Sequence, residues 1–283
     1  GKQYKFLQKE YNLEVRHALS KGDIARGSIG KFEEEFARFL GVKHCITVHS
    51  RTDAVFFTLK ALGVNSNDEV ITTSMNFIGT LAAIKHCGAT ITLIDIKDMP
   101  NEFELKIKNI RIVDATNLIS PKTINENTIY VFSFDYERIL GCYGDGGAIC
   151  TNSDEVAHNT ALLRNLYQIK GVVLHHMDYG WSSTLDNIHA ILLRLKLKKV
   201  PQYISYRKRI AEVYDKELKD VVIVPSERQV YQNYEIQSEK RDDLAKYLLL
   251  QEVETQIKYS PPYHKIDGLG LSHFNLPITE ALS

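Results

Sequence analysis

The 283-residue sequence has few cysteines, no long apolar run and no excess of charge of either sign. Its four cysteines lack C-x-x-C spacing and do not pair with histidines at zinc-finger distances, which excludes a disulfide framework and a metal site of that kind. We expect buried thiols in a cytoplasmic protein. Basic and acidic residues number 35 each, so no strong field attracts nucleic acid or an anionic membrane. No segment approaches the about 18 apolar residues of a membrane span, and no secretory leader opens the chain.

What is present is the composition of a globular protein, with 44% hydrophobic and 25% charged residues. Short apolar segments alternate with helical patterns through the first two-thirds of the chain. Strands are predicted at 45–48, 69–72, 90–94, 110–113, 128–132 and 148–150, and helices at 32–40, 54–62, 78–86 and 185–195. Asn152 followed by Glu155 predicts a capping box at the start of a further helix. This alternation predicts an α/β fold with a mostly parallel sheet covered on both faces.

The pattern changes after Pro201. A polar helix at 203–218 precedes a β-rich run at 221–224, and the rest reads as strand, helix and strand at 231–237, 241–250 and 253–258. We therefore predict a large α/β domain at 1–200 and a smaller α+β domain at 201–283.

One segment carries a specific resemblance. Residues 131–141 read Val-Phe-Ser-Phe-Asp-Tyr-Glu-Arg-Ile-Leu-Gly and lead into Gly-Asp-Gly-Gly-Ala-Ile-Cys-Thr-Asn at 144–152. This resembles the Ser-Phe-His-x-x-Lys-x-Leu-Gly and Gly-Glu-Gly-Gly-x-x-x-Thr-Asn signature of the DegT/DnrJ/StrS family of PLP-dependent sugar aminotransferases. Segments 30–44, 163–165 and 180–186 are similar to further motifs of that family in the same order.

The resemblance implies the type I PLP-transferase fold, in which helices sandwich a mostly parallel sheet and a smaller α+β domain follows. Two departures from the family pattern are visible. The chain is short between Asp95 and Asp114, where a strand-helix unit is missing, and it stops at Ser283, so we expect a truncated C-terminal domain.

Arg138 stands where the family keeps the lysine that forms a Schiff base with the cofactor. A guanidinium stays protonated, so it can neither form that bond nor move the proton of a transamination. Asp135 also replaces the family's preceding histidine.

Four positions fit the cofactor that the resemblance implies. Asp114 matches the acid beneath the pyridine nitrogen, and Phe77 matches the aromatic that stacks on the ring. Ser133 and Thr52 match hydroxyls of the phosphate site. A cap or turn role for Asp114 and core packing for Phe77 are the alternatives.

Three positions do not fit. Arg51 replaces the glycine of a Ser-Gly-Thr turn that lets the backbone approach the phosphate at a helix N-terminus. It could fill the pocket, turn outward to pair with Asp53, or attract an anion, and we favour filling. Asn117 is one methylene shorter than the family's glutamine, and Ser182 replaces an asparagine that reaches the phosphate from the partner subunit.

Three hypotheses follow. The first is a homologue that does not transaminate and serves as a binding or partner module. The second is an enzyme similar to the family's sugar 3-dehydratases, with Asp135, Glu137 or His49 as the base. The third is an ordinary aminotransferase whose lysine lies elsewhere, with Lys122 or Lys170 nearest.

The resemblance also bears on ligands and partners. Pyridoxal or pyridoxamine phosphate held without a covalent link, or no cofactor, are the alternatives, and a nucleotide-linked sugar is the implied ligand. We expect a homodimer with its pockets between subunits, to which residues 180–186 contribute in trans. Tyr179 and Trp181 are typical interface residues, and internal packing is the alternative for Trp181.

Overall fold

The computed structural model describes residues 2–22, 27–96, 103–107, 109–117, 127–169, 172–173, 179–225 and 230–283. In this part of the chain no helix is long and apolar enough to cross a membrane. No group of three or more histidine, cysteine, aspartate or glutamate side chains is placed to hold a metal there.

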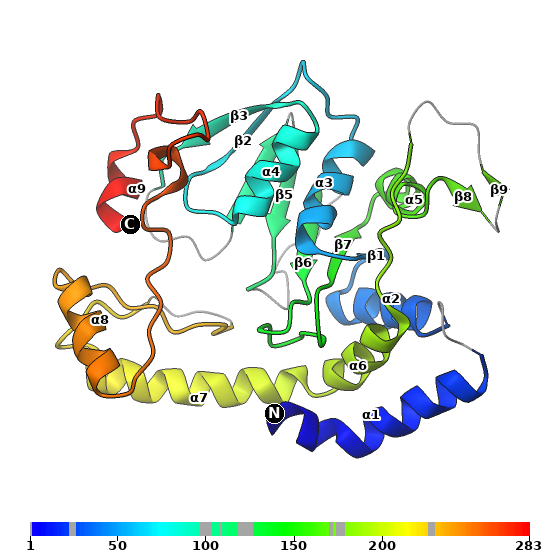
Figure 1. The fold of residues 1–283 in the computed structure, drawn as a ribbon, viewed down its shortest axis with the longest axis horizontal. Coiled ribbons are helices and arrows are strands. Elements are labelled where there is room, and N and C mark those ends of the chain that lie inside the picture. Colours follow the sequence, from blue (N-terminus) through cyan, green and yellow to red (C-terminus); the bar gives the residue numbers. More distant parts are fainter. Residues whose placement is uncertain are drawn as a thin grey trace.

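A seven-stranded sheet forms the centre of the molecule (Figure 1). Its strands are β1 (His44–Val48), β2 (Glu69–Thr73), β3 (Thr90–Ile94), β4 (Phe103–Ile107), β5 (Ile110–Asp114), β6 (Thr128–Ser133) and β7 (Gly147–Thr151). They lie in the order β1-β7-β6-β5-β4-β2-β3. Only β4 and β7 are antiparallel to their neighbours, so the other five strands share one direction. The predicted fold class is confirmed. A separate pair, β8 (Gln168–Ile169) and β9 (Val172–Val173), lies outside this sheet.

The short stretch of chain before Asp114 contains strand β4, which lies between β5 and β2 in the sheet. It pairs with β5 from Phe103 opposite Asp114 to Ile107 opposite Ile110, and touches β2 at Ile71 and Lys106. An antiparallel neighbour needs only a tight turn, whereas a parallel strand needs a crossover of roughly a dozen residues. A hairpin strand therefore stands between β5 and β2, and the sequence pattern did not predict it.

Helices cover both faces of the sheet (Figure 1). The helices of the described residues are α1 (Lys2–Ser20), α2 (Gly27–Leu40), α3 (Arg51–Ala61), α4 (Ile78–His86), α5 (Asp154–Leu163), α6 (Asn187–Leu197), α7 (Val200–Leu218), α8 (Arg241–Leu250), the 3-10 turn η1 (Tyr263–Lys265) and α9 (Pro277–Leu282). The helix containing Leu185 in the prediction begins at Asn187 instead. Helix α5 begins after Ser153, whose hydroxyl accepts from the Val156 N–H at 3.2 Å. The predicted cap at Asn152 is wrong, because that side chain accepts from Lys43 N–H at 2.8 Å.

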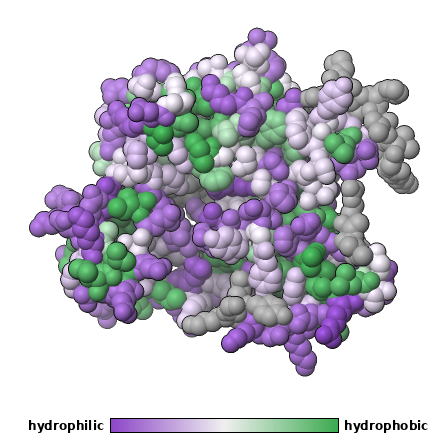
Figure 2. All heavy atoms as spheres, viewed as in Figure 1, coloured by the Kyte–Doolittle hydropathy of each residue, from purple (hydrophilic) through white to green (hydrophobic). Residues whose placement is uncertain are grey.

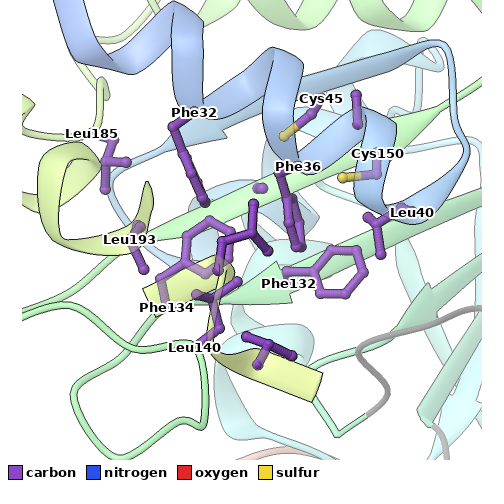
Figure 3. Packing of buried hydrophobic residues seen from close by; sticks show 14 of the residues in the cluster. Phe32, Phe36, Leu40, Cys45, Phe132, Phe134, Leu140, Cys150, Leu185 and Leu193 are labelled. Carbon is purple, nitrogen blue, oxygen red and sulfur yellow. The ribbon is translucent and has the colours of Figure 1, made fainter. Parts of the chain in front are cut away.

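The core has two halves, one on each face of the sheet. Successive strand residues point to opposite faces, so on β6 Phe132 joins the cluster beneath α2 and α6 while Val131 joins the cluster beneath α3, α4 and α5. In the first cluster Phe36 packs edge-on against Phe132 and Phe134, with centroids 5.1 and 5.4 Å apart (Figure 3). These aromatic contacts fix α2 and the chain after β6 to each other.

The C-terminal third differs from the prediction. Helices α7 and α8 form, but the described residues beyond 201 contain no strand, and Ile223 and Gln237 make one isolated bridge. A two-stranded pairing without a covering layer is marginal, so these segments stay irregular. Leu271 and Leu276 then pack in the cluster of α3 and α4, and Asp95 after β3 accepts from Thr279 N–H at 2.8 Å. The chain end thus returns to the sheet, and a boundary at residue 200 stays a prediction.

Candidate active site

The sheet brings four connections to one edge. Strands β1, β2, β5 and β6 share one direction, so their C-terminal ends lie on the same edge, where ligands bind in open α/β sheets. Arg51 opens α3 after β1, and Phe77 precedes α4 after β2. Asp114 and Ser133 end β5 and β6.

Three of these side chains form what we call the Arg51 cluster: Arg51, Phe77 and Asp114. The Arg51 Nη1 atom donates to Asp114 Oδ2 at 3.0 Å, and Arg51 Cζ lies 3.7 Å from the Phe77 ring centroid. The Asp114 side chain has no exposed surface and that of Arg51 is 11% exposed. Because a guanidinium is flat and charged, it satisfies the aromatic face and the buried carboxylate together.

The start of α3 fixes where Arg51 stands. Ser50 caps the helix by accepting from the Asp53 N–H at 3.1 Å. Gly147 on β7 lies so close that a Cβ there would come 2.4 Å from the Ser50 carbonyl oxygen. Asp53 itself accepts from the Ser183 hydroxyl at 2.7 Å. Arg51 therefore points inward, and the outward pairing with Asp53 does not occur.

Arg138 lies beside the cluster in the loop after β6. The loop is fixed by Phe134 N–H to Gly146 O at 2.7 Å and Cys142 N–H to Phe134 O at 2.8 Å, and the Arg138 N–H donates to Asp135 O at 2.9 Å. The Arg138 side chain is partly buried, and its buried Nε atom has no hydrogen-bond partner among the described residues.

The two arginines, Arg51 and Arg138, lie within electrostatic range of each other. Burial, and then the Arg51 guanidinium, lower the pKa of Arg138, and this outweighs the opposite effects of Asp135, Asp114 and Glu137. The Asp135 carboxylate accepts from the Glu137 N–H at 2.9 Å. Neither Asp135 nor Glu137 forms an ion pair with Arg138 in the described part of the chain. The pocket is therefore rich in positive charge around Arg138.

The two hydroxyl groups of the expected phosphate site, on Ser133 and Thr52, both lie against neighbouring parts of the chain. Ser133 Oγ accepts from the Asp135 N–H at 3.2 Å, and the Ser133 N–H donates to Thr116 Oγ1 at 3.2 Å. A Cβ at Gly79 would come 2.3 Å from both Thr52 Oγ1 and the Phe77 ring, so Thr52 lies against Gly79 at the start of α4. Their roles toward a phosphate stay predictions.

Asn117 and Ser182 differ in surroundings. The Asn117 Oδ1 atom is buried and has no partner within the described ranges. Ser182 is exposed and makes a backbone bridge with Asn165. Its neighbour Ser183 is buried and contacts the start of α3. Ser183 Oγ donates to Asp53 and accepts from the His49 N–H at 3.1 Å. Sequence reasoning missed Ser183.

Two tyrosines of the C-terminal segment, Tyr259 and Tyr263, lie within electrostatic range of Arg51 and were missed. Burial raises the pKa of Tyr259 and of Tyr263, and the Arg51 guanidinium acts against this in both. Asp114 also raises the pKa of Tyr259. The Tyr263 N–H donates to Ser74 O at 3.4 Å, which joins this segment to the loop carrying Phe77. The local signal is weak, since only the Pro261-Pro262 pair marks the turn.

No described lysine forms a hydrogen bond or ion pair with the Arg51 cluster. Lys122 and Lys170 lie outside the described residues. Lys196 is fully buried on α6 and donates to the Gly141 carbonyl, beneath the loop that carries Arg138. Burial lowers the pKa of Lys196 to about 8.

A pyridoxal cofactor does not fit the cluster as it stands. Phe77 and Asp114 are the residues predicted to stack on its ring and to bond its ring nitrogen, and the Arg51 guanidinium already contacts both. A ring stacked on Phe77 and bonded to Asp114 would need the same space. Arg51 must leave before such a ring could enter.

Comparisons with known proteins point to one family. The model of the DegT/DnrJ/EryC1/StrS aminotransferase family matches residues 5–123 and 122–269. The dTDP-3-amino-3,4,6-trideoxy-alpha-D-glucose transaminase of Micromonospora megalomicea subsp. nigra is 28% identical over 95% of this chain and 86% of its own length.

Solved structures show the same fold. A DegT DnrJ EryC1 StrS aminotransferase from Brucella abortus superposes with a TM-score of 0.86 at 24% identity, over 100% of this chain and 90% of that one. The NtdA protein of Bacillus subtilis with bound cofactor PMP superposes with a TM-score of 0.83 at 19% identity, over 96% and 74% of the two chains. At these identities the likeness establishes the architecture alone.

Proposed function

Because the chain belongs to the DegT/DnrJ/EryC1/StrS aminotransferase family, we propose that it binds a nucleotide-linked sugar but does not transfer amino groups. The observation that carries the proposal is the Arg138 guanidinium within electrostatic range of Arg51 and Asp114, and we propose that it stands in place of the family's lysine amine. A guanidinium is neither a nucleophile nor a base near neutral pH.

Two further observations support a protein without transaminase chemistry. The Arg51 cluster takes the space that the cofactor ring would need. The buried Lys196 amine, on α6, donates a hydrogen bond to the Gly141 carbonyl. We therefore propose that the native protein holds no covalent cofactor.

The ligand is proposed from the pocket and from the relatives together. The Arg138 Nε atom has no partner in the described part of the chain, and a guanidinium binds phosphate or carboxylate oxygens well. Related proteins are named as transaminases of dTDP- and UDP-linked sugars. A nucleotide sugar supplies such oxygens in its diphosphate.

We also propose a homodimer with the pocket near the subunit interface. The Trp181 ring packs edge-on against Phe56 with centroids 4.9 Å apart, yet it remains 38% exposed. Ile188 on α6 is 50% exposed and Tyr179 is 91% exposed. Apolar surface so close to the segment 180–186 supports a covering partner.

The covalent part of the proposal is tested with pyridoxal phosphate, borohydride reduction and peptide mass mapping. We expect no stoichiometric pyridoxyl-lysine, and a single modified lysine in the pocket would revive the ordinary aminotransferase. Turnover with pyridoxamine phosphate would instead support a dehydratase-like enzyme.

Ligand binding is tested by calorimetry with a dTDP- or UDP-sugar on the unmodified protein. We expect binding in the wild type and weaker binding in Arg138→Gln, because the anion loses a charge-assisted partner. No heat of binding in the wild type for either nucleotide sugar would overturn the proposed ligand class.

Arg138→Lys addresses the chemistry alone. We expect this variant to give no turnover of an amino donor, since Arg51 still lies on Phe77 and Asp114. The measurement is release of the keto acid product with pyridoxal phosphate present. Appreciable turnover by the single variant would show that the ring space is accessible.

A further inference from the structure

The Arg51 cluster has the properties of a binding site rather than of an ordinary ion pair. One wall is an aromatic face, 3.7 Å from Arg51 Cζ, and the other is a carboxylate without exposed surface. Phe77 comes from the connection after β2 and Asp114 from the end of β5, at the same edge of the sheet. A space bounded in this way selects a flat cation, because stacking needs a plane and the carboxylate needs a charge.

The buried carboxylate makes an occupant necessary. Asp114 Oδ1 accepts from the Thr116 N–H at 3.1 Å, but the opposite oxygen has its partner in Arg51. A buried charge left unpaired is strongly unfavourable. Arg138 makes no hydrogen bond or ion pair with Asp114 among the described residues, so the partner is Arg51.

Arg51 is also placed where it can be exchanged. It is the first residue of α3, its side chain retains 11% exposure, and its backbone position is set by Ser50 and Gly147 rather than by the side chain. Removing the side chain would therefore leave the two walls in place. The remaining space would open toward the edge of the sheet.

We propose that Arg51 is an internal ligand: the space between Phe77 and Asp114 is a flat-cation site that the chain fills with its own guanidinium. The wild-type pocket is complete without a cofactor. Truncating Arg51 converts it into a site for a soluble flat cation. This rests on the cluster geometry and holds whether or not the proposed nucleotide sugar binds.

The test compares the wild type with Arg51→Gly, which restores the glycine of a Ser-Gly-Thr turn. Methylguanidinium and pyridoxamine phosphate are the probes, followed by thermal unfolding and by equilibrium dialysis. We expect saturable stabilisation of Arg51→Gly by both probes, with an affinity roughly tenfold or more above that of the wild type. Methylguanidinium should not stabilise the wild type.

Two further variants test whether binding depends on the Asp114 carboxylate and on the flat shape of the guanidinium. Arg51→Gly combined with Asp114→Asn keeps the space but removes the anion, so saturable binding of methylguanidinium should disappear. Arg51→Lys keeps the charge but not the plane, and should be less stable than the wild type. If methylguanidinium still stabilises Arg51→Gly when Asp114 is also replaced by Asn, the proposal is overturned.

The wild type provides a test that does not depend on a variant folding. Stoichiometric, tight binding of pyridoxamine phosphate to the wild type would show that Arg51 does not occupy the site in solution, and would overturn the proposal. Such binding is a different result from amino-donor turnover or loss of nucleotide-sugar binding, which concern the proposed function.

Discussion

At the scale of single residues, the site holds two guanidiniums but only one buried carboxylate. Arg51 takes Asp114 directly, while Arg138 is left with a buried Nε atom and only longer-range attraction to Asp114, Asp135 and Glu137. Asp114 is therefore the residue on which the charge balance of the pocket depends.

Asp114→Asn is expected to destabilise the protein by about 3–5 kcal/mol, because it leaves the Arg51 charge buried without a partner. Urea unfolding of the two proteins measures the difference. Glu104→Gln is the matched control, since its pair with Arg111 is 30–40% exposed and is worth at most about 1 kcal/mol. Equal losses in the two variants would contradict the special position of Asp114.

Lys196 predicts a distinct dependence of stability on pH. Its folded pKa of about 8 lies below the value of about 10.4 for an unfolded lysine. The charged lysine therefore opposes folding below pH 8. Between the two pKa values only the unfolded chain holds the proton, so stability rises with pH, by roughly 1.4 kcal/mol per unit.

Lys196→Met is expected to lack that rise. The measurement is the free energy of unfolding of both proteins at pH 7.5 and at pH 10, with the difference between them isolating the lysine from other groups. A gain of the wild type relative to the variant on the order of 2–3 kcal/mol is expected over this window. Parallel behaviour would show that Lys196 titrates as an exposed lysine.

At the scale of elements, the contact between β7 and the start of α3 decides the direction of Arg51. Gly147→Ala would bring a Cβ 2.4 Å from Ser50 O and 2.9 Å from Arg51 N, both backbone atoms. We expect a loss of about 1–3 kcal/mol as the helix start shifts. Displacement of Arg51 from Phe77 should accompany it in a crystal structure of the variant.

Gly30→Ala is the control for this change. Gly30 lies exposed in α2, and a Cβ there meets no atom within 4 Å. Alanine in a helix interior gains about 0.5–1 kcal/mol over glycine. Urea unfolding should therefore show opposite signs for the two variants. If Gly147→Ala leaves the free energy of unfolding unchanged, the start of α3 can shift without destabilising the protein.

At the scale of the whole molecule, the exposed apolar residues bear on whether the protein forms a dimer. On the face in Figure 2 apolar side chains lie among hydrophilic ones rather than in one continuous patch. One group of exposed apolar residues is Trp181 and Ile188, in and beside the segment 180–186, and another on α8 includes Leu250, which is 80% exposed. The proposed dimer uses the first group.

Light scattering at micromolar concentration tests this assembly. The wild type should give a dimer mass, and Ile188→Glu should shift it toward the monomer by burying a charge in the interface. Leu250→Glu is the control and should leave the mass unchanged. A monomeric wild type would remove any trans contribution from residues 180–186.

The sequence by itself determined six of the seven strands of the large sheet and the helices between them, but not β4. The helix at 78–86 and the strand at 90–94 have the predicted bounds, because helical and strand periodicities are local and each element carries its own apolar face. The order of motifs, including the glycine-rich turn after Arg138, was sufficient to indicate the family. That Arg138 stands at the family's Schiff-base position stays a prediction.

Only the tertiary structure decided what the pocket contains. Arg51 and Asp114 are 63 positions apart, and their contact depends on the sheet order that places β5 near the start of α3. The antiparallel β4 and the irregular segments after 201 also depend on which partner strands are available. A side chain's direction follows from the packing of distant segments. The sequence pattern could therefore identify Arg51 as a candidate but could not predict which way its side chain points.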